Sequence, residues 1–270
     1  MDLHLNEWLQ LAFRWAHVFA GIMWVGATYY FTWLDGRFVE LEEKVAKGEN
    51  PEKYVWMVHS GGFYLVEKQK RPTMMGQTLH WFRWEAAFTW LTGVVLFVML
   101  YYHGGLMEEF EDPKLSNLAA IILSVGMILG GWVIYDLVWK FCKQETVGIV
   151  ISYLLIVATA WVSCHYFAAR AAYLQLGAMM GTIMAANVWM VILPAQKRMV
   201  AALKDGREPD YNEGARAKGR SKHNSFIVIP VVFIMISNHY PFTYGSSYNW
   251  IILSALVLVG WGAAKMIRRA

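Results

Sequence analysis

The sequence contains little charge. Asp, Glu, Lys and Arg make up 16% of its 270 residues, whereas soluble domains average about 25%. Hydrophobic residues make up 57% and lie in long uncharged runs. The composition therefore predicts an integral membrane protein and excludes a soluble protein with one large core. The net charge of +4 indicates no acidic partner, because the basic residues follow membrane topology.

Sequence features of several other protein classes are also missing. No Lys or Arg precedes the first apolar stretch, which excludes a cleavable secretory signal. Cys142 and Cys164 lie near opposite ends of one predicted helical hairpin arm, which excludes a disulfide or a two-cysteine metal site. There is no CxxCH motif for a c-type haem. A glycine-rich phosphate loop and a nucleophile–base pattern are missing too, and nothing indicates nucleic-acid binding.

Seven segments have the length and apolar composition of membrane-spanning helices. The expected fold is an all-α bundle of about seven transmembrane helices that forms one domain, residues 1–270. The sixth segment is short, and Pro230 inside it predicts a kink or break. The segments are about 9–34, 84–103, 117–139, 147–168, 171–195, 225–240 and 248–266.

Positive residues are distributed unevenly between the two sides of this bundle. Of the 24 Lys and Arg residues, 21 lie in the segments 35–83, 140–146, 196–224 and 265–270. Cytoplasmic loops carry such an excess. We therefore expect a bacterial inner-membrane protein with a periplasmic N-terminus, a cytoplasmic C-terminus and two long cytoplasmic loops, 35–83 and 196–224.

The two long loops differ in composition. The charged run 38–53 predicts a solvated helix that ends near Gly48 and Pro51. The segment 54–70 has a glycine pair between aromatic residues, and we interpret it as an element that lies on the membrane surface. The second loop is polar and basic, which predicts a solvated connector that faces anionic lipid.

The first span carries Arg14 and His17 one helical turn apart, with Gly21 a turn further on the same face. An ionisable residue inside a membrane span is costly and indicates a functional site. An imidazole can ligate haem iron, and a guanidinium can hold a haem propionate. The alternative is that His17 bonds to a neighbouring helix while Arg14 reaches the outer headgroups.

Other histidines fall in the same outer half of the bundle. His165 and His239 lie near the outer ends of the fourth and sixth spans, and His103 lies at the end of the second. Each alone is more typical of a hydrogen-bonded interfacial residue, but histidines on different spans can converge in a bundle. We predict a b-type haem ligated by His17, with His239 or His165 opposite.

A few other polar residues lie at depth. Asn187 falls near the middle of the fifth span. Asp136 and Glu85 are expected to form interfacial ion pairs with Arg83 or Lys140.

Seven stretches together resemble the membrane-bound urate hydroxylase family, which is named for the urate oxidase N-terminal domain. They are RWAHVFAGIMWVGATYYFTWLD, VHSGGFYLVEK, LHWFRWEAAFTWLTG, GWVIYDL, GTIMAANVWMVILPAQKRMV, RAKGRSKHNSF and FIMISNHYPFTYG. The resemblance implies oxidation of urate to 5-hydroxyisourate in purine breakdown, with electrons passing to cytochrome c. That family carries a C-terminal cytochrome c domain, and this chain ends at Ala270 without one. A separate cytochrome c or a partner subunit is therefore the expected acceptor.

Urate is a flat anion, so its pocket should offer a guanidinium, amide or imidazole groups and an aromatic face. Arg170 and Gln175 flank a very short outer loop that could close little over a ligand. We therefore predict the pocket on the cytoplasmic side, with the first loop as a lid. The predicted catalytic residues are His80 and Arg83, and the predicted substrate-binding residues are Gln77, His59, His223 and Asn224.

Two other functions fit the sequence. One is a non-catalytic cytochrome b-like subunit of a respiratory complex. The other is a haem-free transporter or assembly protein. A transporter is expected to show paired inverted halves with interrupted helices, and only one Pro-interrupted span is found.

Overall fold

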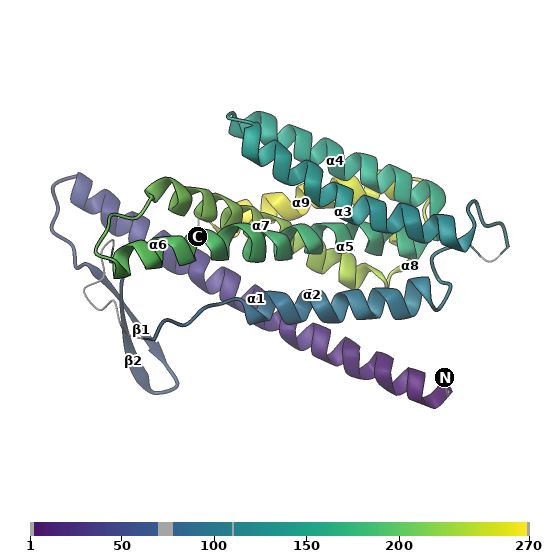
Figure 1. The fold of residues 1–270 in the computed structure, drawn as a ribbon, viewed down its shortest axis with the longest axis horizontal. Helices are drawn as coiled ribbons and strands as arrows, with labels where there is room; N and C mark the ends of the chain where they lie inside the picture. The colour runs from purple at the N-terminus through teal and green to yellow at the C-terminus, as the bar shows by residue number, and fades with distance from the viewer. Residues whose placement is uncertain (1–2, 70–77, 110, 269–270) are drawn as a thin grey trace.

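The chain forms a bundle of long helices with a small β-hairpin at one end (Figure 1). A computed structural model describes residues 3–69, 78–109 and 111–268. The prediction of an all-α fold is confirmed apart from the hairpin. In chain order the elements are α1 Leu3–Ala46, β1 Tyr54–His59, β2 Gly62–Glu67, α2 Trp84–Phe97, the π-helical η1 Val98–Tyr102, α3 Asn117–Phe141, α4 Glu145–Tyr166, α5 Ala169–Ala186, the π-helical η2 Asn187–Ile192, α6 Leu193–Lys204, α7 Tyr211–Ser237, α8 Pro241–Tyr244 and α9 Asn249–Ile267.

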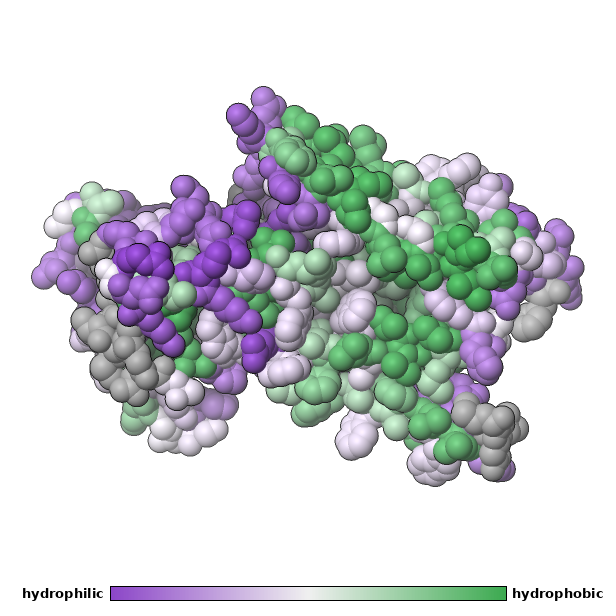
Figure 2. All heavy atoms as spheres, viewed as in Figure 1, coloured by the Kyte–Doolittle hydropathy of each residue, from purple (hydrophilic) through white to green (hydrophobic). Residues whose placement is uncertain are grey.

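Among the described residues, five helical segments are long and apolar enough to cross a membrane. They coincide with five of the seven predicted spans. Figure 2 shows apolar residues over the middle of one face and hydrophilic residues towards its two ends. The first and sixth predicted spans lie within the more polar helices α1 and α7, so a total of seven stays a prediction. The five segments are Trp84–Tyr102, Asn117–Phe141, Glu145–Tyr166, Ala169–Lys204 and Asn249–Ile267.

The core is centred on α5, which packs against α3, α4 and α7. Glycines allow the closest approaches between these helices. Gly131 of α3 lies against Met179, and a Cβ on Gly177 of α5 would lie 2.9 Å from Ile234 of α7. α7 runs through Pro230, so the predicted break is not formed, while the alternative of a kink stays a prediction. α1 and α2 pack mainly against each other and form a separate pair at the edge of the bundle (Figure 1).

The second long loop is helical, so its prediction as a solvated connector is wrong. α6 continues to Lys204 and α7 begins at Tyr211, which leaves only residues 205–210 between them. The Asp210 side chain caps α7 by accepting a hydrogen bond of 2.9 Å from the Asn212 backbone N–H. Arg216, Lys218 and Lys222 occupy the exposed face of α7, while Arg220 lies on its buried face. A solvated loop and a helix with one charged face have similar amino-acid compositions, so composition alone does not distinguish them here.

The segment interpreted as a surface element forms an antiparallel hairpin, paired from Tyr54–Glu67 to His59–Gly62. Its two-residue turn, Ser60–Gly61, has φ values of 50° and 76°. Positive φ at both positions suits a tight hairpin turn, and glycine adopts it readily. The predicted end of the preceding helix near Gly48 is confirmed, since α1 ends at Ala46. That helix is one piece with the first predicted span.

Candidate functional site

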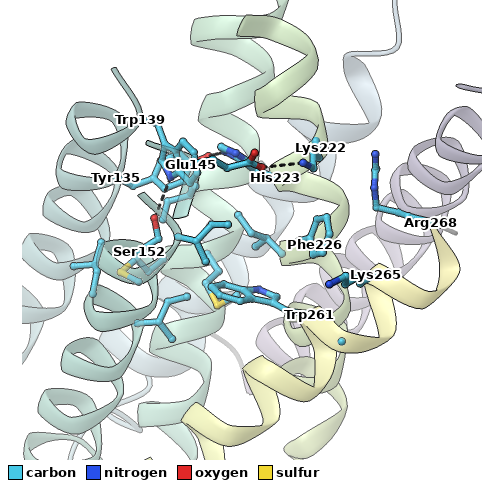
Figure 3. Close-up of a pocket in the computed structure, with 18 residues that line it drawn as sticks. Tyr135, Trp139, Glu145, Ser152, Lys222, His223, Phe226, Trp261, Lys265 and Arg268 are labelled. Carbon is cyan, nitrogen blue, oxygen red and sulfur yellow. Dashed lines mark hydrogen bonds and ion pairs between the residues drawn. The ribbon is translucent and has the colours of Figure 1, made fainter. Parts of the chain in front are cut away.

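A cavity of about 680 Å³ lies among α3, α4, α5, α7 and α9 (Figure 3). This volume is typical of small-molecule sites, which are mostly apolar and carry a few placed polar groups. The polar groups lie where α4 begins and α9 ends, on the side that the sequence predicts to be cytoplasmic. The apolar part of the wall consists of Ile149, Leu155, Ile156, Met179, Met180, Ile183 and Ile227.

Asn187 organises the buried side of this cavity. It begins η2, the π-helical turn that precedes Pro194, and Pro194 has no N–H to continue regular helix bonding. The Asn187 amide nitrogen donates to the Tyr135 hydroxyl at 3.0 Å and to Asn224 Oδ1 at 2.9 Å. Its oxygen accepts from Arg220 at 3.4 Å. The three polar partners of this side chain therefore come from α3 and α7.

The two ends of this network set the direction of its hydrogen bonds. Arg220 can only donate, and the Met184 carbonyl, which receives the Asn224 amide at 3.0 Å, can only accept. The Tyr135 hydroxyl therefore accepts from Asn187, and Nδ1 of His223, at 2.7 Å, is the acceptor that the described residues offer to the hydroxyl proton. This assigns the neutral tautomer of His223 with its proton on Nε2.

His223 lines the cavity. It lies two residues before the predicted span 225–240. Burial, together with the positive charges of Arg220 and Lys222, lowers the pKa of His223 to about 4. The imidazole is therefore neutral at neutral pH, in agreement with the direction of the network. Its Nε2–H has no partner within the described chain and is available to a ligand.

Aromatic rings adjoin this imidazole. The Trp139 ring centroid lies 4.0 Å from that of His223. The Trp139 indole N–H donates to Ser152 at 3.0 Å, which fixes the ring across the α3–α4 contact. Tyr135 closes the same side of the cavity. A flat ligand would meet these rings beside the imidazole donor.

An ion pair behind the cavity holds α7 to α3. Arg220 donates to Asp136 at 2.6 Å, and its side chain is only 5% exposed. The predicted pairing of Asp136 with Arg83 or Lys140 is therefore wrong, because α7 begins early enough to carry Arg220 to this depth. Glu85 has a buried carboxylate oxygen without a hydrogen bond in the described part of the chain, so its predicted pairing is not formed either.

The mouth of the cavity is positively charged. Lys222 pairs with Glu145 at 2.9 Å. Figure 3 shows Lys265 and Arg268 on α9, across the cavity from the imidazole and the aromatic rings. Arg268 donates to the Ser225 hydroxyl at 2.7 Å, and neither α9 residue forms an ion pair with the described residues. Two uncompensated cations at an opening attract an anionic ligand.

The predicted cytoplasmic site residues are not brought together. His223 lines the cavity and Asn224 supports Asn187 behind it. His59 lies exposed at the end of β1, and His80 packs edge-on against Phe82. Arg83 lies over the Trp84 ring and does not line the cavity. Gln77 lies outside the described residues. The catalytic roles of His80 and Arg83 stay predictions.

His17 lies in the seam between α1 and α2. Its Nδ1 is 2.9 Å from the Thr89 carbonyl and 3.2 Å from the Thr92 hydroxyl. Donation from Nδ1 to the carbonyl leaves Nε2 free, which is the arrangement that orients a histidine ligand of a metal. Gly93 provides the space, since a Cβ there would lie 2.9 Å from the imidazole. His17 is therefore a residue that would hold haem iron through Nε2 if haem were bound in this seam.

The outer end supplies two guanidinium groups. Arg14 and Arg170 both act electrostatically on the Tyr101 hydroxyl, and Arg170 also donates to Tyr244 at 3.3 Å. Two cations in one region suit the two carboxylates of haem. By contrast Gln175 is buried and bonded to Ser124, so it joins α5 to α3.

The predicted second haem ligands are less constrained. His165 and His239 are both exposed, and His165 stacks parallel on Trp161 at 5.4 Å. Within the described residues, no hydrogen bond or ring contact joins either of them to His17. Across the described ranges, no three His, Cys, Asp or Glu side chains lie close enough together to hold a metal ion.

Sequence reasoning missed Tyr135, Trp139 and Arg220 as members of this site. A signal for Arg220 was present, because Arg220, His223 and Asn224 follow the i, i+3, i+4 spacing of one helix face. Asn187 and Asp136 also lay at membrane depth, where polar residues indicate function. The interpretation of residues 196–224 as a loop hid this pattern.

A family model described as "Urate oxidase N-terminal" matches residues 3–269, nearly the whole chain. No curated protein and no solved structure matches the chain.

Proposed function

The chain belongs to the urate oxidase N-terminal family, and from this premise we propose that it oxidises urate in the cavity beside His223. The observation that carries this choice is the hydrogen-bond network around His223, whose Nε2–H has no partner in the described chain, in a partly open cavity lined by Lys265 and Arg268. Among the described residues, this arrangement combines an imidazole donor, aromatic walls and cations in one enclosure.

Each part of the cavity matches one property of urate. Lys265 and Arg268 attract the anion to the mouth. The flat ring system lies against Trp139 and Tyr135. The His223 Nε2–H donates to a carbonyl oxygen or ring nitrogen, and Tyr135 and Asn187 hold the imidazole in the tautomer that can do so. The apolar remainder of the wall excludes bulk water.

Conversion of urate to 5-hydroxyisourate consumes one water molecule and releases two electrons and two protons. We propose that a b-type haem bound by His17, with Arg14 on a propionate, supplies one-electron transfer. The hydrogen bond that fixes Nδ1 of His17, and the electrostatic effect of both Arg14 and Arg170 on Tyr101, support this assignment. A separate cytochrome c on the periplasmic side, or a partner subunit, is the proposed final acceptor, in a bacterial inner membrane with the C-terminus in the cytoplasm.

Steady-state urate oxidation by purified variants tests the substrate site. His223→Phe keeps the ring and removes both nitrogens, and loss of one hydrogen bond to a charged ligand costs about 1.5–3 kcal/mol. We expect kcat/KM for urate to fall roughly 10- to 150-fold. His59→Phe, an exposed histidine on the hairpin, is the matched control and should keep wild-type activity.

Arg83→Ala in the same assay tests the alternative cytoplasmic site. A large loss of urate oxidation in Arg83→Ala, with no change in His223→Phe, would show that urate binds outside the cavity. The proposed reaction itself would still stand. A wild-type protein that binds haem but transfers no electrons from urate would contradict the reaction itself and favour the cytochrome b-like subunit.

A further inference from the structure

The β-hairpin is unusual for an exposed element because it lacks charge. The thirteen residues from Tyr54 to Val66, YVWMVHSGGFYLV, include no Asp, Glu, Lys or Arg. Exposed edge strands normally carry charged side chains, which prevent association with other molecules. Two-stranded hairpins are also marginally stable in water unless something covers one face. The composition therefore indicates that this hairpin does not face bulk water alone.

One face of the hairpin is apolar and open. Trp56 pairs across the strands with Leu65, and Val58 pairs with Phe63, so the four side chains form one continuous patch. Their exposed fractions are 59%, 53%, 69% and 80%. The opposite face packs on α1, where the Tyr30 hydroxyl donates to the Met57 sulfur at 3.4 Å. Within the described chain nothing covers the open patch.

Contacts with α1 fix the hairpin at the predicted edge of the membrane. The Tyr30–Met57 contact and the Lys68–Asp35 ion pair at 2.8 Å bracket the end of the first predicted span, 9–34. Phe31 of α1 and Phe82 lie at the same level, with ring centroids 4.7 Å apart, and both are exposed. The hairpin slants away from the bundle beside α1 (Figure 1). The hairpin thus lies at the same end of the first predicted span as the exposed rings of Phe31 and Phe82.

We propose that the hairpin is a membrane-interface anchor whose Trp56, Val58, Phe63 and Leu65 side chains insert among lipid headgroups and upper acyl chains. Aromatic side chains favour this zone, and burial of the apolar patch removes it from water. The apolar and charged residues are distributed along the hairpin as this orientation in the membrane requires. The apolar pairs lie towards the turn, while Lys53 and Lys68 lie at the open end, where lipid phosphates attract them.

A photo-crosslinking benzophenone amino acid at position 63, in protein kept in its native membrane, tests the anchor. Mass spectrometry of the hairpin peptide after illumination should show phospholipid adducts. The matched probe at position 57, on the covered face, should crosslink within the chain to α1 and give several-fold fewer lipid adducts. A second probe at position 58, on the open face of the other strand, should repeat the result of position 63.

Adducts at positions 58 and 63 that contain another protein, a second copy of this chain or another segment of the same chain would overturn the proposal. Illumination without adducts at both positions would place the face in water and also overturn it. Equal lipid labelling at positions 57 and 63 would contradict the assignment of one face. None of these readouts depends on urate oxidation.

Discussion

The helices around α5 and the α1–α2 pair hold their functional side chains in different ways. Gln175, Asn187 and Arg220 are buried polar residues of the α3–α9 part, and each of these three has a fixed partner. In α2 only Ala86 is buried. His17 lies in a thin seam and bonds to a backbone carbonyl. We therefore expect substitution of these core residues to lower the free energy of unfolding strongly, and substitution in the α1–α2 seam to change it little.

The largest stability effect is expected for the buried ion pair of the core. Asp136→Ala leaves the Arg220 guanidinium buried without its carboxylate. Breaking a buried pair costs about 3–5 kcal/mol, and the partial exposure of Asp136 favours the lower end of that range. Denaturant or thermal unfolding in detergent measures the loss. Glu145→Ala removes the exposed pair with Lys222 and should cost at most about 1 kcal/mol. Equal losses in the two variants would contradict the comparison.

A smaller effect is expected where α9 meets α7. In Gly260→Ala the new methyl group would lie 2.8 Å from Pro230 Cδ and 3.0 Å from its backbone nitrogen. Backbone atoms cannot move aside as a side chain does, so overpacking should cost roughly 1–3 kcal/mol. Gly262→Ala, on the same helix, has no atom within 4 Å of the new group. It should be neutral or stabilise by about 0.5–1 kcal/mol through helix propensity. A loss in Gly262→Ala that matched Gly260→Ala would show that the tight contact is not the cause.

Composition and hydropathy predicted the helical membrane fold, because membrane-spanning helices are defined by local sequence. The start of α7 was not predictable in the same way. Its basic residues are typical of a cytoplasmic loop. The spacing of Arg220, His223 and Asn224 indicates one helix face, but only the contact of Arg220 with Asp136, 84 positions earlier, shows that this face is buried. The hairpin had a local signal in its two runs of β-branched and aromatic residues, which the Gly61–Gly62 pair separates.

The candidate site was predicted in part for the same reason. His223 and Asn224 were identified by residue type, but their partner Tyr135 lies 88 positions before His223. Asn187 was noted as a polar residue at depth, and its role depends on the geometry of η2. Contacts between distant segments decide which polar residues share a cavity, and one sequence does not contain them.

The smallest expected stability effect, and the sharpest test of the α1–α2 pair, is Gly93→Ala. The new Cβ would lie 2.9 Å from Cε1 and 3.3 Å from Nδ1 of His17. The ring must shift, which lengthens the Nδ1 bond to the Thr89 carbonyl. Because α1 is largely exposed around His17, the seam can open, and the cost in unfolding free energy should stay below about 1 kcal/mol.

The optical spectrum should respond far more than stability does. Since the carbonyl bond orients the imidazole, its disturbance should weaken or shift the reduced α-band of the proposed haem. His17→Ala should abolish the band. Gly21→Ala, whose new methyl group would meet only a Thr89 methyl at 3.9 Å, should keep the wild-type spectrum. A wild-type protein without an α-band would refute haem binding. A normal α-band in both Gly93→Ala and His17→Ala would show that haem binds outside the α1–α2 seam.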